Sequence, residues 1–227
     1  MTSPALAAVL WDMDGTLVDT EPHWMAAEAA LVASFGGTWT HEQALGMVGL
    51  GLDDAARNLQ DAGVRMPVDE IVTYMTDAVM TTIASDGVPF RPGARELLLA
   101  LRAAGLKTAL VTMSMRRMAT TIAELIGDDV FDVIVAGDDV TRPKPFPDPY
   151  LQACEALGVS ASEVVAIEDS PNGLRSAVAA GTAAIGVPLM VSVAGVGATA
   201  VWPTLEGRTV DDVASVHAHR HTSGDAR

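Results

Sequence analysis

Residues 5–20 read ALAAVLWDMDGTLVDT, and this stretch decides the fold. Its first seven residues, through Trp11, contain no polar side chain. Such a short apolar run is typical of a strand that is buried on both faces, as in a parallel sheet. The run stops at the acidic sequence DMDGT (12–16), so the expected strand brings two carboxylates directly to its carboxyl end.

The same alternation continues after residue 87. Apolar runs predict four more strands, at 106–112, 131–136, 164–167 and 182–187. Helix-like segments lie beside them, at 94–104, 115–126, 148–157 and 172–180. Ser114 is placed to cap the second of these helices. Strands that alternate with helices require crossover connections, so they predict an α/β fold built on a parallel sheet.

One segment interrupts this pattern. Between residues 21 and 86 there is no buried-strand run, and helical patterns occur at 24–35, 42–48, 53–62 and 68–85. We therefore expect a helical cap domain at 21–86, inserted into a core that is formed by 1–20 and 87–215. The alternative is a single enlarged layer of crossover helices without a separate domain.

The last residues, 216–227, are expected to form a flexible tail. This segment contains three of the five histidines, His217, His219 and His221. Alternating histidines can bind a transition metal. A flexible tail without a metal is the favoured interpretation.

Composition excludes several classes of protein. Lys and Arg total 14 and Asp and Glu total 29, for a formal net charge of −15. This acidity argues against nucleic acid and against an anionic membrane surface as partners. A single cysteine, Cys154, excludes an intramolecular disulfide and a cysteine-based metal cluster. With no apolar stretch of about 18 residues and no basic N-terminal segment, we expect a cytoplasmic protein, monomeric by default.

Polar side chains follow the first four predicted strands. In chain order they are Asp12 and Asp14, Thr112, Lys144, and Glu168 and Asp169. Because the carboxyl ends of parallel strands share one edge of a sheet, we expect these side chains to converge. Carboxylates gathered at one point need a counter-charge, and Mg²⁺ supplies it where a phosphate shares the site. Lys144 and the Thr112 hydroxyl are suited to hold a phosphoryl group.

Four segments together resemble the motifs of the haloacid dehalogenase superfamily. They are DMDGTLVDT (12–20), VT (111–112), KPFPDPY (144–150) and IEDSPNG (167–173). Their order and spacing match, and the resemblance covers about residues 7–190. It implies a Rossmann-like core with a cap inserted after the first strand. The members that look most similar are phosphatases and phosphomutases like phosphoglycolate phosphatase and β-phosphoglucomutase.

The resemblance also implies a role for each site residue. Asp12 would be the nucleophile and a ligand of Mg²⁺, and Asp14 the general acid and base, with its backbone carbonyl as a metal ligand. Thr112 and Lys144 would bind the transferred phosphoryl group. The remaining candidate metal ligands are Asp169 and, directly or as an outer acceptor, Glu168. The implied reaction is hydrolysis of a small phosphomonoester through an aspartyl-phosphate on Asp12.

Related activities are separated by particular residues. Asp14 favours phosphoryl transfer, because dehalogenases of the family lack an acid/base aspartate at this position. A phosphonatase needs a cap lysine, and residues 1–106 contain none. A sugar phosphomutase must hold a second phosphate in the cap, which calls for Arg or Lys. The cap contains only Arg57 and Arg65 against ten acids, and Leu52 stands where β-phosphoglucomutase-like proteins carry an arginine.

These features favour a phosphatase whose substrate has a neutral distal part, such as a sugar, polyol or nucleoside. The phosphomutase is the alternative, because a core arginine such as Arg91 or Arg116 could supply the missing charge. A third hypothesis is a non-catalytic protein that binds metal and phosphate.

Overall fold

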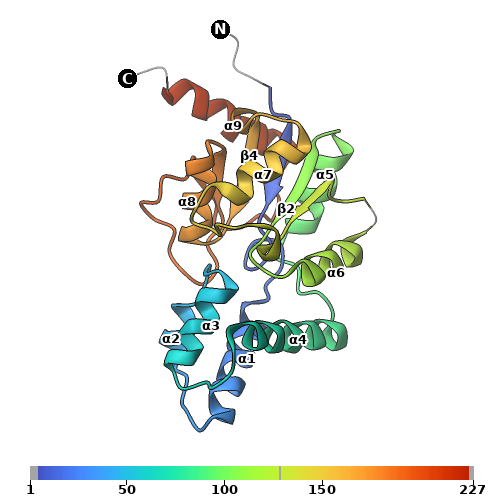
Figure 1. Cartoon of the computed structure of the whole chain (residues 1–227). Helices are drawn as coiled ribbons and strands as arrows, with labels where there is room; N and C mark the ends of the chain where they lie inside the picture. Colours follow the sequence, from blue (N-terminus) through green and yellow to red (C-terminus); the bar gives the residue numbers. More distant parts are fainter. Residues whose placement is uncertain (1–4, 128, 225–227) are drawn as a thin grey trace.

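The computed structural model describes residues 5–127 and 129–224, and a six-stranded sheet lies at its centre (Figure 1). The strands are β1 (Ala8–Trp11), β2 (Lys107–Val111), β3 (Val133–Val135), β4 (Val164–Glu168), β5 (Ala183–Gly186) and β6 (Ala200–Val201). Their order is β3-β2-β1-β4-β5-β6, and every neighbouring pair is parallel. This confirms the predicted α/β fold with a Rossmann-like sheet. The two-residue strand β6 is an addition that the apolar pattern did not indicate.

Strand β1 occupies the middle of the sheet, and all four of its residues are buried. Leu10 lies opposite Ala109 of β2 on one side and opposite Ala166 of β4 on the other. Successive side chains enter opposite faces, so Trp11 joins one hydrophobic cluster and Leu10 the other. A central strand therefore needs apolar residues at every position, as this one has.

Helices cover both faces of the sheet. The cluster that contains Trp11 is built with α5 (Ala94–Ala103), α6 (Arg116–Ile126) and α9 (Val210–Gly224). The opposite cluster is built with α7 (Asp148–Leu157) and α8 (Pro171–Ala180). Short 3-10 turns lie at Gly137–Asp139 and Ala161–Glu163. None of the described helices is both long and apolar enough to pass through a lipid bilayer.

Four further helices, here called the cap helices, lie between β1 and β2 in the chain. They are α1 (Glu21–Ser34), α2 (His41–Leu45), α3 (Leu52–Asp61) and α4 (Val68–Asp86). Helix α4 packs against α1 and α3, and the group lies beyond the carboxyl ends of the strands, at the bottom of Figure 1. Thr40 and Gln43 form a reciprocal capping box that begins α2. The cap helices therefore lie over the sheet edge where the polar residues are.

The C-terminal segment differs from the flexible tail that we expected. Residues 216–224 belong to α9, which packs against β4 and β5. Val213, Val216 and His217 are buried, and a ring nitrogen of His217 lies 2.8 Å from the Ser162 carbonyl oxygen. Val213 and Val216, three residues apart, thus give α9 a buried apolar face. The polar residues around them make this face hard to recognise in the sequence. Residues 225–227 of the predicted tail lie outside the described residues.

Candidate active site

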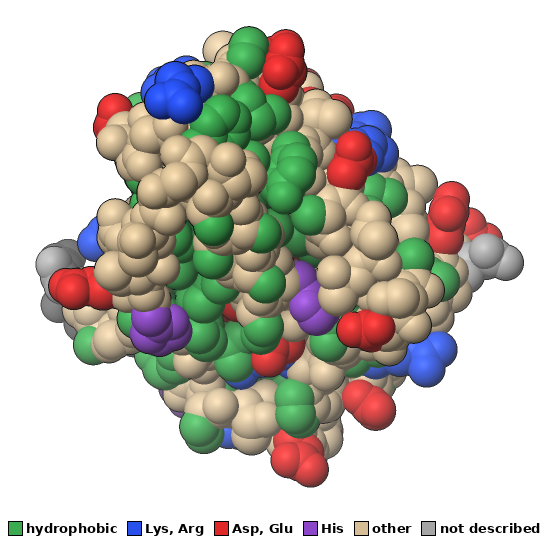
Figure 2. Space-filling view, turned by 90° about the horizontal axis from the view of Figure 1, so that it is seen from below, with side chains coloured by type: hydrophobic (Ala, Val, Ile, Leu, Met, Phe, Trp, Pro, Cys, Tyr) green, Lys and Arg blue, Asp and Glu red, His purple; other side chains and the backbone are tan. Residues whose placement is uncertain are grey.

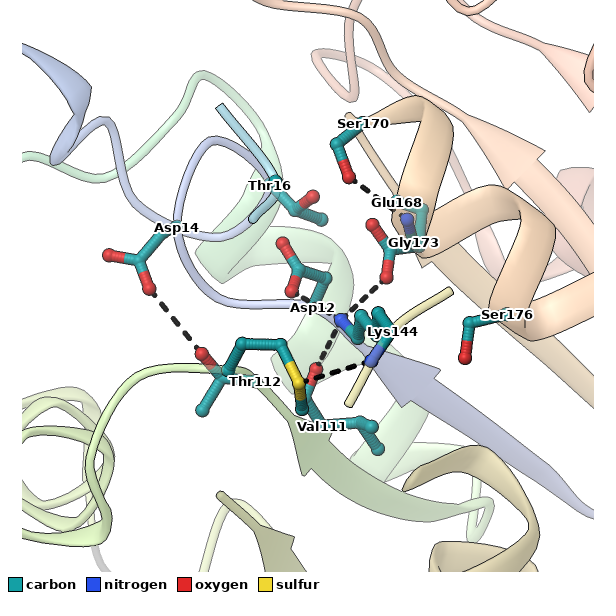
Figure 3. A network of polar contacts seen from close by, with 12 residues as sticks. Asp12, Asp14, Thr16, Val111, Thr112, Lys144, Glu168, Ser170, Gly173 and Ser176 are labelled. Atoms are coloured by element: carbon teal, nitrogen blue, oxygen red, sulfur yellow. Dashed lines mark hydrogen bonds and ion pairs between the residues drawn. The ribbon is translucent and has the colours of Figure 1, made fainter. Parts of the chain in front are cut away.

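The carboxyl ends of three adjacent strands bring the predicted site residues together (Figure 3). Asp12 follows β1 and Thr112 follows β2, while Glu168 ends β4 and is followed by Asp169. Lys144 comes from the loop after β3 and lies among them. Their side chains converge because β1 pairs with both β2 and β4, so the three strands end side by side.

Lys144 is the electrostatic centre of this group. Its Nζ lies 2.7 Å from Asp12 Oδ1 and 2.6 Å from Glu168 Oε1, and it donates to the Val111 carbonyl oxygen at 2.8 Å. Burial lowers the pKa of the ammonium, but the carboxylates of Asp12 and Glu168 more than offset this and leave the pKa raised. The Tyr150 hydroxyl also donates to Glu168 Oε1, at 2.5 Å. Lys144 is therefore a fixed, buried positive charge beside Asp12.

Three carboxylates form a cluster that fits a divalent cation. Asp12, Glu168 and Asp169 each place an oxygen within 4.8 Å of the others, and all three are buried. Asp169 Oδ2 and Glu168 Oε2 are buried without a hydrogen-bond partner, which is costly unless a ligand satisfies them. Gly15 approaches this cluster so closely that a Cβ there would lie 2.2 Å from Asp169 Oδ2. Hard oxygen donors of this kind suit Mg²⁺.

Crowding of these acids changes their proton affinity. Burial, followed by the charge of Glu168, raises the pKa of Asp12 to about 7, and Lys144 opposes the change. Burial, together with Asp12 and Glu168, also raises the pKa of Asp169. One buried ammonium does not compensate three carboxylates, so a bound cation would lower both pKa values.

Asp14 is held apart from this cluster by four hydrogen bonds. Its Oδ1 accepts from Thr20 Oγ1 at 2.5 Å and from Trp24 Nε1 at 2.9 Å. Its Oδ2 accepts from Ser114 Oγ at 2.6 Å and from Thr112 Oγ1 at 3.4 Å. The side chain points toward Thr112 rather than toward Asp12, although only one residue separates the two aspartates (Figure 3). Gly15, the next residue, has a φ of +78°, a conformation that glycine adopts readily, and this lets the chain turn directly after Asp14.

The expectation that Ser114 caps a helix was wrong. Met115 is the residue that precedes α6, and the first N–H of that helix, from Arg116, donates to Asp138 Oδ1 at 2.8 Å. The Ser114 hydroxyl is instead used by Asp14, and its backbone N–H donates to Thr112 Oγ1 at 3.0 Å. The loop after β2 thus turns the Ser114 hydroxyl back toward the sheet edge. A capping interaction would instead have turned it toward helix α6.

Sequence reasoning also missed Trp24 and Tyr150 as partners of site residues. Trp24 lies one helical turn after Thr20, and that spacing could have indicated that both reach the same acceptor. Tyr150 reaches Glu168 from α7, and nothing local in the sequence indicates that contact.

A cavity extends from Asp12 and Lys144 into the cap helices. Its cap side is mostly apolar and includes Trp24, Met47, Leu52, Leu59, Ile71 and Met75. The exceptions are two carboxyl groups, those of Glu21 and Glu28. In the view from the cap side, apolar side chains gather in the middle of the face and Lys and Arg lie toward its rim (Figure 2).

Lys144 is the one cationic residue among those that line the cavity. Arg57 pairs with Asp53 and Asp54 on the exposed surface of α3, and Arg65 lies over the Phe35 ring. Arg91 and Arg116, the core arginines named in the sequence analysis, are also engaged elsewhere. Arg91 donates to the carbonyl oxygens of Gly15 and Val187, and Arg116 pairs with Asp139. The cap side thus has no cation for a second phosphate among the described residues.

Besides the Trp24–Asp14 hydrogen bond, two further contacts join the cap segment to the core. Arg117 of α6 pairs with Asp77 of α4 and donates to the Thr73 carbonyl oxygen at 3.3 Å. Asn172 of α8 donates to the Gly49 carbonyl oxygen at 3.2 Å. These contacts hold the cap helices over the sheet edge.

Several known proteins are similar to this chain. Protein CbbY of Rhodobacter capsulatus is 34% identical over 197 residues, which are 81% of this chain and 86% of that protein. N-acetylmuramic acid 6-phosphate phosphatase of Pseudomonas aeruginosa is 34% identical over 188 residues, 78% and 79% of the two chains. The crystal structure of CbbY from Rhodobacter sphaeroides in complex with xylulose-1,5-bisphosphate superposes with a TM-score of 0.81. It is 28% identical and covers 92% of this chain and 99% of that one.

The family model of the haloacid dehalogenase-like hydrolases matches residues 6–181. This range includes the β1 acids, the cap helices, Lys144 and the acids at the end of β4. The match confirms the family that the four sequence motifs indicated. The chain belongs to the haloacid dehalogenase-like hydrolases.

Proposed function

We propose that this chain is a Mg²⁺-dependent phosphatase, which hydrolyses a small phosphomonoester metabolite through an aspartyl-phosphate on Asp12. The observation that carries the proposal is the contact of Asp12 with buried Lys144, beside a cluster of acids that fits a cation. Asp12 lines a cavity whose walls are formed by both core and cap residues. The named relatives include a sugar phosphate phosphatase, which supports the same class of substrate.

In the first step, a carboxylate oxygen of Asp12 attacks phosphorus and the bond from phosphorus to the leaving oxygen breaks. Asp14 donates its proton to that oxygen, so the leaving group departs as an alcohol. Lys144 and the Thr112 hydroxyl hold the phosphoryl oxygens. A cation held by Asp12, Asp169 and the Asp14 carbonyl would supply positive charge that offsets the negative charge on those oxygens.

In the second step, water attacks the phosphorus of the acyl phosphate. Asp14 takes the proton from this water, the bond to Asp12 breaks, and inorganic phosphate leaves. Asp14 must therefore exchange its present partners for the substrate. Its contacts with Thr20 and Trp24 link that exchange to α1 of the cap.

Glu168 contributes to this reaction by holding other groups in place. One of its oxygens accepts from both Lys144 and Tyr150, so it fixes the ammonium against Asp12. The other oxygen has no partner and is available to a metal-bound water or to the cation itself.

The cavity favours hydrolysis over a mutase reaction. A phosphomutase must bind a second phosphate, and the described cap residues that line the cavity include no Arg or Lys. The two core arginines, Arg91 and Arg116, are bound to other groups. We infer that the leaving group carries no second phosphate.

The test is phosphate release from a panel of phosphomonoesters, with Mg²⁺ and with a chelator. We expect metal-dependent release that is lost in Asp12→Asn and in Asp14→Asn, and retained in Asp148→Asn, whose carboxylate pairs with Arg142 outside the cavity. Isomerisation of a sugar phosphate primed with its bisphosphate, without net hydrolysis, would contradict the proposal and revive the mutase. Metal binding without turnover of any ester would favour the non-catalytic alternative.

A further inference from the structure

Two carboxyl groups occupy the otherwise apolar cap end of the cavity. Glu21 and Glu28 are seven residues apart on α1, so they lie on the same face of the helix. Both line the cavity, and their exposed fractions are only 8% and 4%. Acidic side chains are rarely this buried unless a partner compensates them.

The protein itself supplies little of that compensation. Glu21 has no hydrogen-bond partner among the described residues, and the nearby negative charges of Asp14 and Glu28 disfavour its ionised form. Glu28 accepts one hydrogen bond, from Trp39 Nε1 at 2.9 Å, which leaves its second oxygen without a donor. Burial is the main cause that raises the pKa of Glu21 to about 8 and that of Glu28 to about 7.

A structural role accounts for these residues only in part. Glu21 lies in the first turn of α1, where the helix dipole favours an anion. That argument does not apply to Glu28, which lies two turns further along the helix. Nor does it explain why both carboxyl groups face a cavity rather than bulk solvent.

The surroundings select among possible ligands. The other cap residues at the cavity are apolar or glycine, so they offer no side-chain partners for the many hydroxyls of a sugar. The nearest cation, Lys144, is already paired with Asp12 and Glu168. A ligand that brings its own positive charge would favour the ionised form of both buried carboxyl groups and pair with them, whereas an anionic ligand would find no free cation at this end of the cavity.

We propose that Glu21 and Glu28 form a subsite for a protonated amine, carried by an otherwise apolar leaving group. The substrate class is then an amino-alcohol phosphate whose hydrocarbon part contacts the cap. This inference rests on the proposed phosphatase activity and replaces the neutral leaving group that the sequence suggested with a cationic one. The two glutamates are specificity residues, because they bind the leaving group away from the reacting atoms.

The test compares kcat/KM for matched esters: 2-aminoethyl, 4-aminobutyl and 6-aminohexyl phosphate against ethyl, butyl and hexyl phosphate. Hydroxyalkyl and carboxyalkyl phosphates of the same lengths complete the series. We expect one amine to exceed its alkyl counterpart by roughly 10-fold or more, as a charge-assisted hydrogen bond would provide. The carboxyalkyl esters are expected to be the poorest substrates.

The variants Glu21→Gln and Glu28→Gln keep the shape and remove the charge. Each is expected to reduce the amine-to-alkyl ratio toward one, and the ratio cancels any general loss of activity. Glu70→Gln on the exposed surface of α4 makes the same charge change away from the cavity and should keep the full ratio. If a variant does not fold, the ester series on the unchanged protein still decides the question.

The outcomes separate the two proposals. Equal hydrolysis of aminoalkyl and alkyl esters would overturn the amine subsite and leave the phosphatase intact. Hydroxyalkyl esters as good as the amines would also overturn it, in favour of an uncharged donor. Failure to hydrolyse any ester would instead contradict the proposed function.

Discussion

Lys144 shows at the scale of one residue how the site is held together. Its ammonium is buried and touches both Asp12, the proposed nucleophile, and Glu168, so it supports the site and the fold at once. Removing one partner from a buried ion pair typically costs about 3–5 kcal/mol, because the other charges stay buried without compensation.

We expect Lys144→Met to lower the free energy of unfolding by about 3 kcal/mol at pH 8 without added divalent metal, and to abolish phosphate release. Equilibrium unfolding in urea measures the first effect. The chain contains one other lysine, Lys107, which is exposed and donates to the Leu157 carbonyl oxygen. Lys107→Met should cost less than about 1.5 kcal/mol and keep activity, so equal losses in the two variants would contradict the assigned role.

The candidate residues could be expected from the sequence wherever each directly follows a buried strand. Asp12, Thr112 and Asp169 are of this kind, because the ends of parallel strands meet at one edge. Trp24 was indicated only by its spacing from Thr20, and Tyr150 could not be expected, because it reaches the site from a helix whose docking depends on the whole fold. Ser114 was assigned to a helix cap, because a hydroxyl before a helix has the same local pattern in both roles.

At the scale of elements, α1 and α4 connect the cap helices to the core chemistry. Helix α1 carries Trp24, which binds Asp14, and α4 carries Asp77, which pairs with Arg117 of α6. The Arg117–Asp77 pair is exposed, so it contributes little to overall stability. Because it joins α4 of the cap helices to α6 of the core, we expect it to help hold the cap helices over the cavity.

Arg117→Ala is therefore expected to raise KM several-fold while the free energy of unfolding changes by less than about 1 kcal/mol. Steady-state kinetics on the best substrate and urea unfolding measure the two effects. Arg102→Ala is the matched control, since Arg102 pairs with Asp132 within the core. A change in KM that is the same in both variants would show that the cap contact has no special effect.

A helix or strand could be predicted where its local sequence pattern shows which residues are buried. The first five strands are mostly apolar, with polar residues such as Lys107 and Glu168 at their ends. Core helices lie between them, although the start signal at Ser114 was misleading. Strand β6 has two residues, too few to give a pattern. Helix α9 was missed because its buried residues, Val213, Val216 and His217, stand among polar ones.

On the scale of the whole molecule, the buried acids control how stability depends on pH. The pKa of Asp12 is raised to about 7, that of Glu21 to about 8 and that of Glu28 to about 7. Between the ordinary values near 4 and these raised values, the folded state holds protons that the unfolded state has lost. Stability therefore falls as pH rises through this range.

We expect the melting temperature, measured without divalent metal, to decrease from pH 5 to pH 8. In Glu21→Gln the decrease should be shallower, because the folded state no longer gains, at low pH, about 1.4 kcal/mol of unfolding free energy for each unit by which the pKa of Glu21 is raised. Glu70→Gln should follow the unchanged protein across the range, because Glu70 is exposed. A Glu21→Gln profile parallel to that of the unchanged protein would contradict a raised pKa at Glu21.

The central claim is that Asp12 attacks phosphorus and carries the phosphoryl group. The direct measurement uses Asp14→Asn with p-nitrophenyl phosphate, whose leaving group departs without a proton, so only the second step needs the missing acid/base. We predict that acid quenching during turnover traps one phosphoryl group, which peptide mass spectrometry places on Asp12 and which Asp12→Asn lacks. A phosphoryl group on another residue, or p-nitrophenol release by Asp12→Asn at the unchanged rate, would contradict the account.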